Sequence, residues 1–140
     1  MANASEERQH LLKMALLANA CFSTVSGLLL VFVQRSIVRF LGLSEDTNLV
    51  ALGIGLIAFA VVLLFYARKR PIKLLDAWIA VLMDFAWVIA SYPLIFMAPF
   101  STAGKWLVGF VADIVLLFAL LQWMGIRRIR KGNIAPQLNR

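Results

Sequence analysis

LLDAWIAVLMDFAWVIASYPLIF, residues 74–96, is the stretch that decides the fold. At a helical rise of about 1.5 Å per residue, it is long enough to cross a bilayer core of about 30 Å. It nevertheless carries Asp84 near its middle. An ionisable group at that depth is costly and usually faces the interior of a helix bundle. The stretch therefore predicts a transmembrane helix with one acid turned away from lipid.

The composition of the whole chain supports this interpretation. Of the 140 residues, 62% are hydrophobic, whereas soluble domains have roughly 45–50% apolar residues. A chain of this length should form a single domain, residues 1–140, and only lipid can accept so much apolar surface. Apolar runs predict spans at about 11–33, 48–66, 74–96 and 106–126. We therefore expect an all-α polytopic membrane protein, a bundle of four transmembrane helices.

The first connection has its own pattern. Residues 34–44 are apolar but interrupted by Arg35 and Arg39, which predicts a short amphipathic turn lying in the membrane interface. Gly42 is expected to end that turn, since glycine readily adopts the left-handed conformation at a helix end. Ser44 is expected to cap the second span through its hydroxyl.

Small and hydroxyl residues predict further contacts. Ala51, Gly55 and Ala58 form one face of the second span and favour close packing against another helix, whereas Gly53 falls elsewhere and has no assigned role. Ser101 is expected to cap the fourth span. The very short turn before residue 74 predicts that the second and third spans are antiparallel neighbours.

The basic residues predict the orientation. If the N-terminus is inside, only Arg35, Arg39 and Lys105 fall on the outer side. The cytoplasmic side then holds Arg8, Lys13, Arg68, Lys69, Arg70, Lys73, Arg127, Arg128, Arg130, Lys131 and Arg140. Lys and Arg favour the cytoplasmic side, so we expect both termini inside (N-in/C-in), in a bacterial-type inner (plasma) membrane.

The net charge of +7 also needs an explanation. Because the bases sit at the ends of apolar runs, we interpret them as topology signals and lipid contacts rather than as a nucleic-acid surface. Arg127, Arg128, Arg130 and Lys131 are expected to contact lipid headgroups. Gly132 is expected to stop the last helix, which leaves residues 132–140 as a disordered tail.

Two acids define the candidate site. Asp84 lies about 15 Å from the inner start of its helix, and Asp113 lies about 12 Å from the outer start of its own. Both positions reach the middle of the bilayer, so we expect the two carboxyl groups to face each other. Asn19, Trp87 and Ser91 are expected to complete this site. Gln122 points away from Asp113 and is set aside.

The chemistry of such a site leaves several functions open. No Lys, Arg or His lies at the depth of the acids, so one proton could be shared between them. A proton or a lipophilic cation would suit two acids beside an indole, as in a small transporter or ligand-binding bundle. Such a bundle could work as a homodimer, since four short spans enclose little volume. Alternatively, the acids only fix packing in an accessory or scaffold subunit of a larger membrane complex.

A third alternative is an intramembrane aspartyl hydrolase, because two aspartates can activate water. Bacterial lipoprotein signal peptidases have about four spans and two aspartates, but they pair each aspartate with an asparagine. Here Val111 stands near Asp113, and no asparagine accompanies Asp84. We expect no cofactor or metal, since there is no metal-ligand cluster and His10 lies outside the apolar run. Cys21 is the only cysteine, which excludes an intrachain disulfide.

Overall fold

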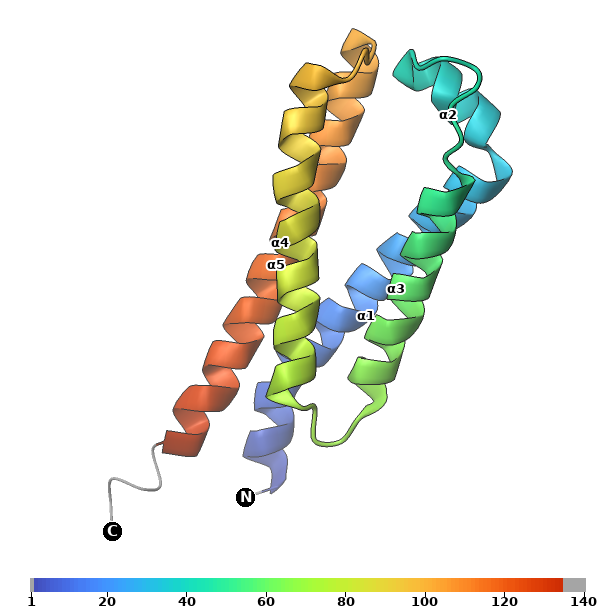
Figure 1. The fold of residues 1–140 in the computed structure, drawn as a ribbon. Coiled ribbons are helices and arrows are strands. Elements are labelled where there is room, and N and C mark those ends of the chain that lie inside the picture. Colours follow the sequence, from blue (N-terminus) through green and yellow to red (C-terminus); the bar gives the residue numbers. More distant parts are fainter. Residues whose placement is uncertain (1, 135–140) are drawn as a thin grey trace.

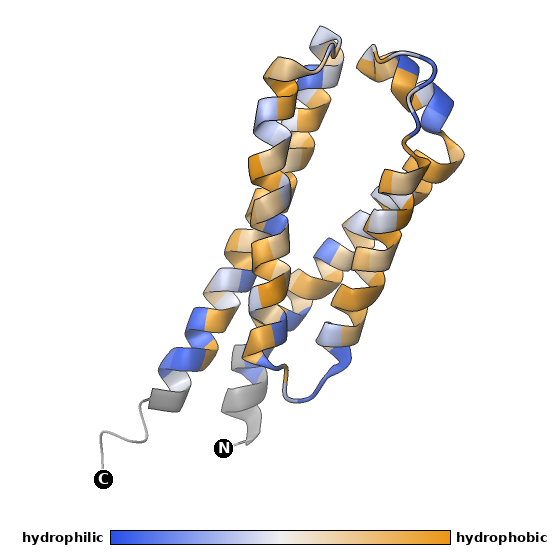
Figure 2. Cartoon of the chain, viewed as in Figure 1, coloured by the Kyte–Doolittle hydropathy of each residue, from blue (hydrophilic) through white to orange (hydrophobic). Residues whose placement is uncertain are grey.

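The structure is a computed structural model that describes residues 2–134. The described chain is all α-helical, as predicted, with helices α1 (Ala2–Phe32), α2 (Gln34–Leu41), α3 (Val50–Arg68), α4 (Leu74–Met97) and α5 (Thr102–Ile134). The four long helices each contain a segment long and apolar enough to cross a membrane. Apolar residues cover most of their length, and hydrophilic residues gather toward the ends (Figure 2).

The long helices form two antiparallel pairs. α1 packs along α3, α4 packs along α5, and α1 also contacts α5. The pairs lie close together where α1 begins and α5 ends, and they diverge toward the end that carries α2 (Figure 1). The prediction that α3 and α4 are neighbours is wrong for most of their length, because few of their residues come close. A short turn joins them, yet each packs mainly on a different partner.

Two glycines explain why α3 packs closely along α1. A Cβ atom added to Gly27 would lie 2.7 Å from the carbonyl oxygen of Gly53, and one added to Gly53 would lie 2.7 Å from that of Gly27. The backbones therefore approach more closely than any side chain would permit. The predicted contact face was misplaced, since Gly55 has no heavy atom within 4 Å of an added Cβ and Gly53 makes the contact instead.

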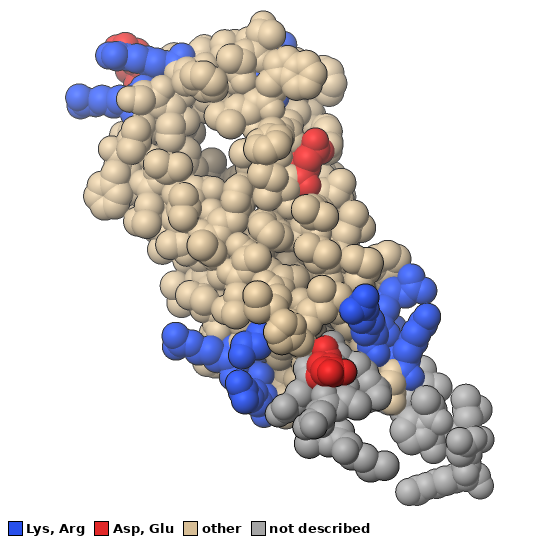
Figure 3. Space-filling view, turned by 180° about the vertical axis from the view of Figure 1, so that it is seen from behind, with Lys and Arg blue, Asp and Glu red and all other residues tan. Residues whose placement is uncertain are grey.

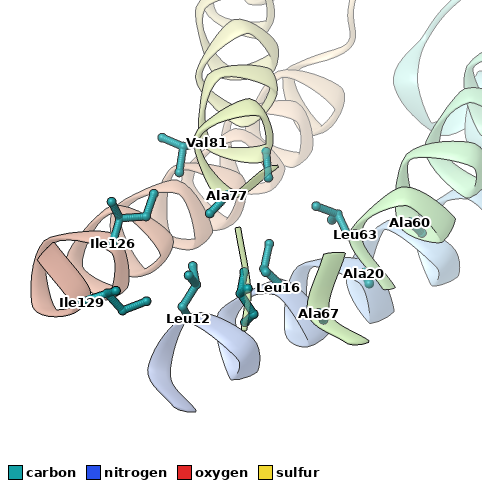
Figure 4. Packing of buried hydrophobic residues seen from close by; sticks show 12 residues of the cluster. Leu12, Leu16, Ala20, Ala60, Leu63, Ala67, Ala77, Val81, Ile126 and Ile129 are labelled. Carbon is teal, nitrogen blue, oxygen red and sulfur yellow. The ribbon is translucent and has the colours of Figure 1, made fainter. Parts of the chain in front are cut away.

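The main hydrophobic cluster lies where the helix pairs meet (Figure 4). It combines leucine and isoleucine side chains with alanines, which let the helices approach. Its members are Leu12, Leu16, Ala20, Ala60, Leu63, Ala67, Ile72, Ala77, Ala80, Val81, Ile126 and Ile129. Toward the end that carries α2 the helix pairs diverge, and a separate element bridges them (Figure 1).

The short helix α2 makes that bridge. Its apolar residues Val38 and Leu41 are buried, and Gly42 ends it with a left-handed φ of 74°, as the sequence predicts. The backbone N–H of Ser101, just before α5, donates to the carbonyl oxygen of Leu41 at 2.7 Å. A Cβ added to Gly104 would lie 2.8 Å from that same oxygen. α2 therefore links the α1–α3 pair to the start of α5.

Two helix-end predictions have different outcomes. Ser101 caps α5 as expected, because its hydroxyl accepts the backbone N–H of Gly104 at 2.9 Å. Ser44 does not cap α3, which begins at Val50 and whose first N–H is accepted by Asn48 Oδ1 at 2.9 Å. Residues 44–47 form a turn instead, in which the backbone N–H of Thr47 donates to the carbonyl oxygen of Ser44 at 2.9 Å and the two hydroxyls lie 3.1 Å apart.

The end of α5 also differs from the prediction. Gly132 does not stop the helix, which continues to Ile134. Glycine is tolerated inside a helix at a cost of about 1 kcal/mol relative to alanine, and here it remains within the helical turn. Residues 135–140 of the predicted tail lie outside the described residues.

The cap at Ser101 gives a first testable prediction. Ser101→Ala should lower the free energy of unfolding by about 0.5–2 kcal/mol, because the N–H of Gly104 loses its acceptor. It should also loosen α2, since the Ser101 hydroxyl donates to the carbonyl oxygen of Phe40 at 2.8 Å. Thermal unfolding in detergent micelles measures the loss. Ser44→Ala is the matched control, and an equal loss in that variant would contradict the capping role.

Candidate functional site

A buried polar cluster lies next to the core and connects three helices. The side chain of Asp84 on α4 is only 2% exposed. Its Oδ2 atom accepts a hydrogen bond from Asn19 Nδ2 of α1 at 2.7 Å and another from Gln122 Nε2 of α5 at 2.8 Å. Buried hydrogen bonds of this kind hold helices in a fixed register inside an apolar bundle.

The two amides are satisfied to different degrees. Asn19 Oδ1 also accepts a hydrogen bond from Ser23 Oγ, one turn along α1, at 3.3 Å. Gln122 Oε1 is buried and has no hydrogen-bond partner among the described residues. A buried acceptor without a donor is costly, so the Gln122 end is the weaker side of the cluster.

The expected pairing of Asp84 with Asp113 is wrong. The carboxylate of Asp113 is exposed and accepts a hydrogen bond from the hydroxyl of Tyr92 at 2.7 Å. Tyr92 follows Asp84 by eight residues, which is about 12 Å along α4. Because α4 and α5 are antiparallel, the same register that places Gln122 beside Asp84 places Asp113 beside Tyr92. The two acids therefore lie at different heights.

Gln122 was wrongly set aside for a related reason. It follows Asp113 by nine residues and therefore lies about 180° around the helix, as expected. The inward face of α5, however, is the one that carries Gln122, together with Ala112, Val115, Ala119, Ile126 and Ile129. The sequence did contain a signal, since alanines mark packed faces in membrane bundles. Asp113 lies on the opposite, outward face.

The polar cluster borders a cavity between the two helix pairs. The cavity has a volume of about 260 Å³, and its walls come from all four long helices. Most of the lining is apolar or aromatic, and the polar groups belong to the cluster and to serines of α1. The lining residues are Asn19, Phe22, Ser23, Ser26, Ala51, Leu52, Gly55, Leu56, Phe59, Met83, Asp84, Trp87, Val111 and Val115.

The remaining predicted members of the site have separate positions. Trp87 is half-buried and lines the cavity with Asp84. Ser91 is buried, but its hydroxyl donates to the carbonyl oxygen of Trp87 at 2.8 Å within its own helix. Ser91 is thus satisfied by α4 alone and contributes no polar group to the cavity wall.

Basic residues at the ends of the helices contact an acid and aromatic rings. Lys69 Nζ lies 2.7 Å from Asp76 Oδ2 and also 4.7 Å from the centre of the Phe65 ring. In the predicted headgroup cluster, Arg127, Arg128, Arg130 and Lys131 are exposed on α5. The guanidinium of Arg127 lies 4.9 Å from the centre of the Trp123 ring. These contacts hold cations next to aromatic rings at the ends of the apolar segments.

The arrangement defines what the cavity can do chemically. The described residues include no group of three or more His, Cys, Asp or Glu side chains that could hold a metal ion. The cavity instead offers the carboxylate of Asp84. Its Oδ2 atom accepts two hydrogen bonds, and its Oδ1 atom has no hydrogen-bond donor among the described residues. Aromatic rings of Phe22, Phe59 and Trp87 share its wall. A carboxylate beside aromatic faces attracts an organic cation.

Comparison with known proteins adds no assignment to this geometry. No family model, curated protein or solved structure matches the chain.

Proposed function

We propose that this protein is a small integral membrane protein that binds a lipophilic organic cation in the cavity beside Asp84. The observation that carries the proposal is the buried carboxyl group of Asp84 at the edge of an apolar cavity of about 260 Å³. Apolar walls with a few fixed polar groups are typical of small-molecule sites. The amides of Asn19 and Gln122 hold Asp84 in place, and the aromatic lining supplies cation–π attraction.

The proposal includes a membrane location and orientation. Both helix ends with the most bases, those of α3 and α5, lie at the end of the bundle where α1 begins (Figure 1). In a bacterial-type inner membrane this end would face the cytoplasm, because Lys and Arg accumulate on that side. Arg127, Arg128, Arg130 and Lys131 would then lie near anionic headgroups. Accessibility of a label placed at each terminus of the chain in intact spheroplasts tests this orientation.

A matched pair of ligands tests the site. Benzyltrimethylammonium and its neutral carbon isostere, neopentylbenzene, have the same shape and differ in charge. With ligand concentrations corrected for partition into the nanodisc lipid, the purified protein should bind the cation at least about tenfold more tightly, a difference of about 1.4 kcal/mol. Asp84→Asn should remove this preference while circular dichroism shows the same helix content. Binding is followed by the fluorescence of tryptophan, since Trp87 lines the cavity.

Asp76→Asn is the control, because it removes an acid from the same helix outside the cavity. That variant should keep the preference for the cation. If wild-type protein binds both ligands equally, or if Asp84→Asn keeps the preference, the proposal is wrong.

A further inference from the structure

The hydrogen-bonded pair of Asp113 and Tyr92 stands on the outer surface of the α4–α5 pair. Asp113 is exposed, although it lies well inside the apolar segment of α5. The nearest base before it on that helix is Lys105, about 12 Å away along the axis. In the proposed membrane location, the carboxylate of Asp113 therefore faces the hydrocarbon region.

An acid in that position lacks a charge partner. The hydroxyl of Tyr92 donates one hydrogen bond to Oδ1, but it brings no positive charge. Ionisable groups at such depth almost always face a bundle interior, a wet cavity or an opposite charge. Asp113 faces none of these within the described residues, so an opposite charge on another molecule would lower the cost of its position in the membrane.

The surroundings of the pair form a helix-sized apolar surface. Exposed residues continue the face of Tyr92 on α4 and the face of Asp113 on α5 at helical spacing. They are Ile89 and Phe96 on α4, and Trp106, Phe110 and Leu117 on α5. Figure 3 shows acidic atoms within such an uncharged face, away from the basic ends of the molecule. A transmembrane helix fits a surface with two parallel apolar ridges.

The charge of the pair identifies the chemistry of that helix. In a symmetric dimer, a second copy of this chain would place Asp113 against Asp113. It could not supply the missing positive charge at that depth, because the Lys and Arg residues of this chain lie near the ends of the apolar segments. We infer that the outer α4–α5 face, defined by these seven residues, binds a different transmembrane helix that carries one Lys or Arg. The positive charge of that Lys or Arg would pair with the carboxylate of Asp113 and neutralise it.

Designed peptides test this inference directly. The full-length protein, with a donor dye at its C-terminus, is placed in phosphatidylcholine vesicles with a Leu/Ala transmembrane peptide that carries an acceptor dye. One peptide has a single Lys at the depth of Asp113, and the matched peptide has Leu there. Energy transfer should show an association constant at least about fivefold higher for the Lys peptide, or about 1 kcal/mol. Asp113→Asn should abolish the difference.

Controls separate this charge effect from other causes. Asp76→Asn should keep the preference for the Lys peptide, and circular dichroism should show that Asp113→Asn retains its helix content. Equal association with both peptides would overturn the inference. Self-association of the protein that depends on Asp113, without any preference for the Lys peptide, would also overturn it in favour of a second copy.

Discussion

Asp84→Ala should destabilise the bundle by about 2 kcal/mol or more, because it removes the acceptor of two buried amides at once. Asn19 and Gln122 each donate to Asp84 Oδ2. Two buried donors left without a partner, at about 1–3 kcal/mol each, should cost more than the roughly 0.6 kcal/mol that one interhelical hydrogen bond contributes on average in a membrane protein. Equilibrium unfolding with sodium dodecyl sulfate in mixed micelles, followed by circular dichroism, measures the loss.

Two other variants make this prediction specific. Asp84→Asn keeps a side-chain oxygen that can accept hydrogen bonds, so its loss should be smaller than that of Asp84→Ala. Ser91→Ala removes only a hydrogen bond within α4 and should change stability by less than about 0.5 kcal/mol. If Ser91→Ala costs as much as Asp84→Ala, the polar cluster does not join the helices.

Gly27→Leu should separate α1 from α3. Its Cβ would lie 2.7 Å from the carbonyl oxygen of Gly53 and 3.2 Å from the backbone nitrogen of Ile57. Neither backbone atom can move without shifting α3. The free energy of unfolding should therefore fall by about 3 kcal/mol or more, which is at the upper end of the range for overpacked cores. Unfolding in mixed micelles and a lower yield of monodisperse protein would report it.

Gly55 supplies the matched control for this prediction. A Cβ there meets no heavy atom within 4 Å, yet the residue lines the cavity. Gly55→Leu should therefore remain folded and lower the affinity for benzyltrimethylammonium, because the new side chain occupies the cavity. A loss of stability equal to that of Gly27→Leu would show that close backbone contact is not what holds α1 to α3.

The helices were predictable from the sequence, whereas the way they pair was not. Long apolar runs with bases at their ends have few alternatives to a membrane helix, so all four runs are helical in the structure. Hydropathy does not identify a partner, because lipid and a neighbouring helix are equally apolar. The contact between Gly27 and Gly53 depends on both helices, and neither glycine indicates its partner alone.

The burial of Asp84 was predictable from the sequence, whereas its partner on α5 was not. The sequence indicates that Asp84 must avoid lipid, and the structure buries it against Asn19. The choice of partner on α5 depended on which face of that helix turns inward. Asp113 is the more polar residue, but Gln122 has the alanines of the packed face beside it. An acid can remain on the outward face of a helix if another molecule covers it, as we infer for Asp113.

The divergence of the two helix pairs has a consequence for any ligand. α3 and α4 come close only near their connection, and both contribute to the wall of the cavity. A guest that enters between them would come from the bilayer rather than from water. Its apparent affinity would then follow its partition coefficient into lipid, so that weak intrinsic binding could suffice for a strongly lipid-soluble guest. Dilution of the protein with extra lipid, at constant total ligand, would lower the occupancy.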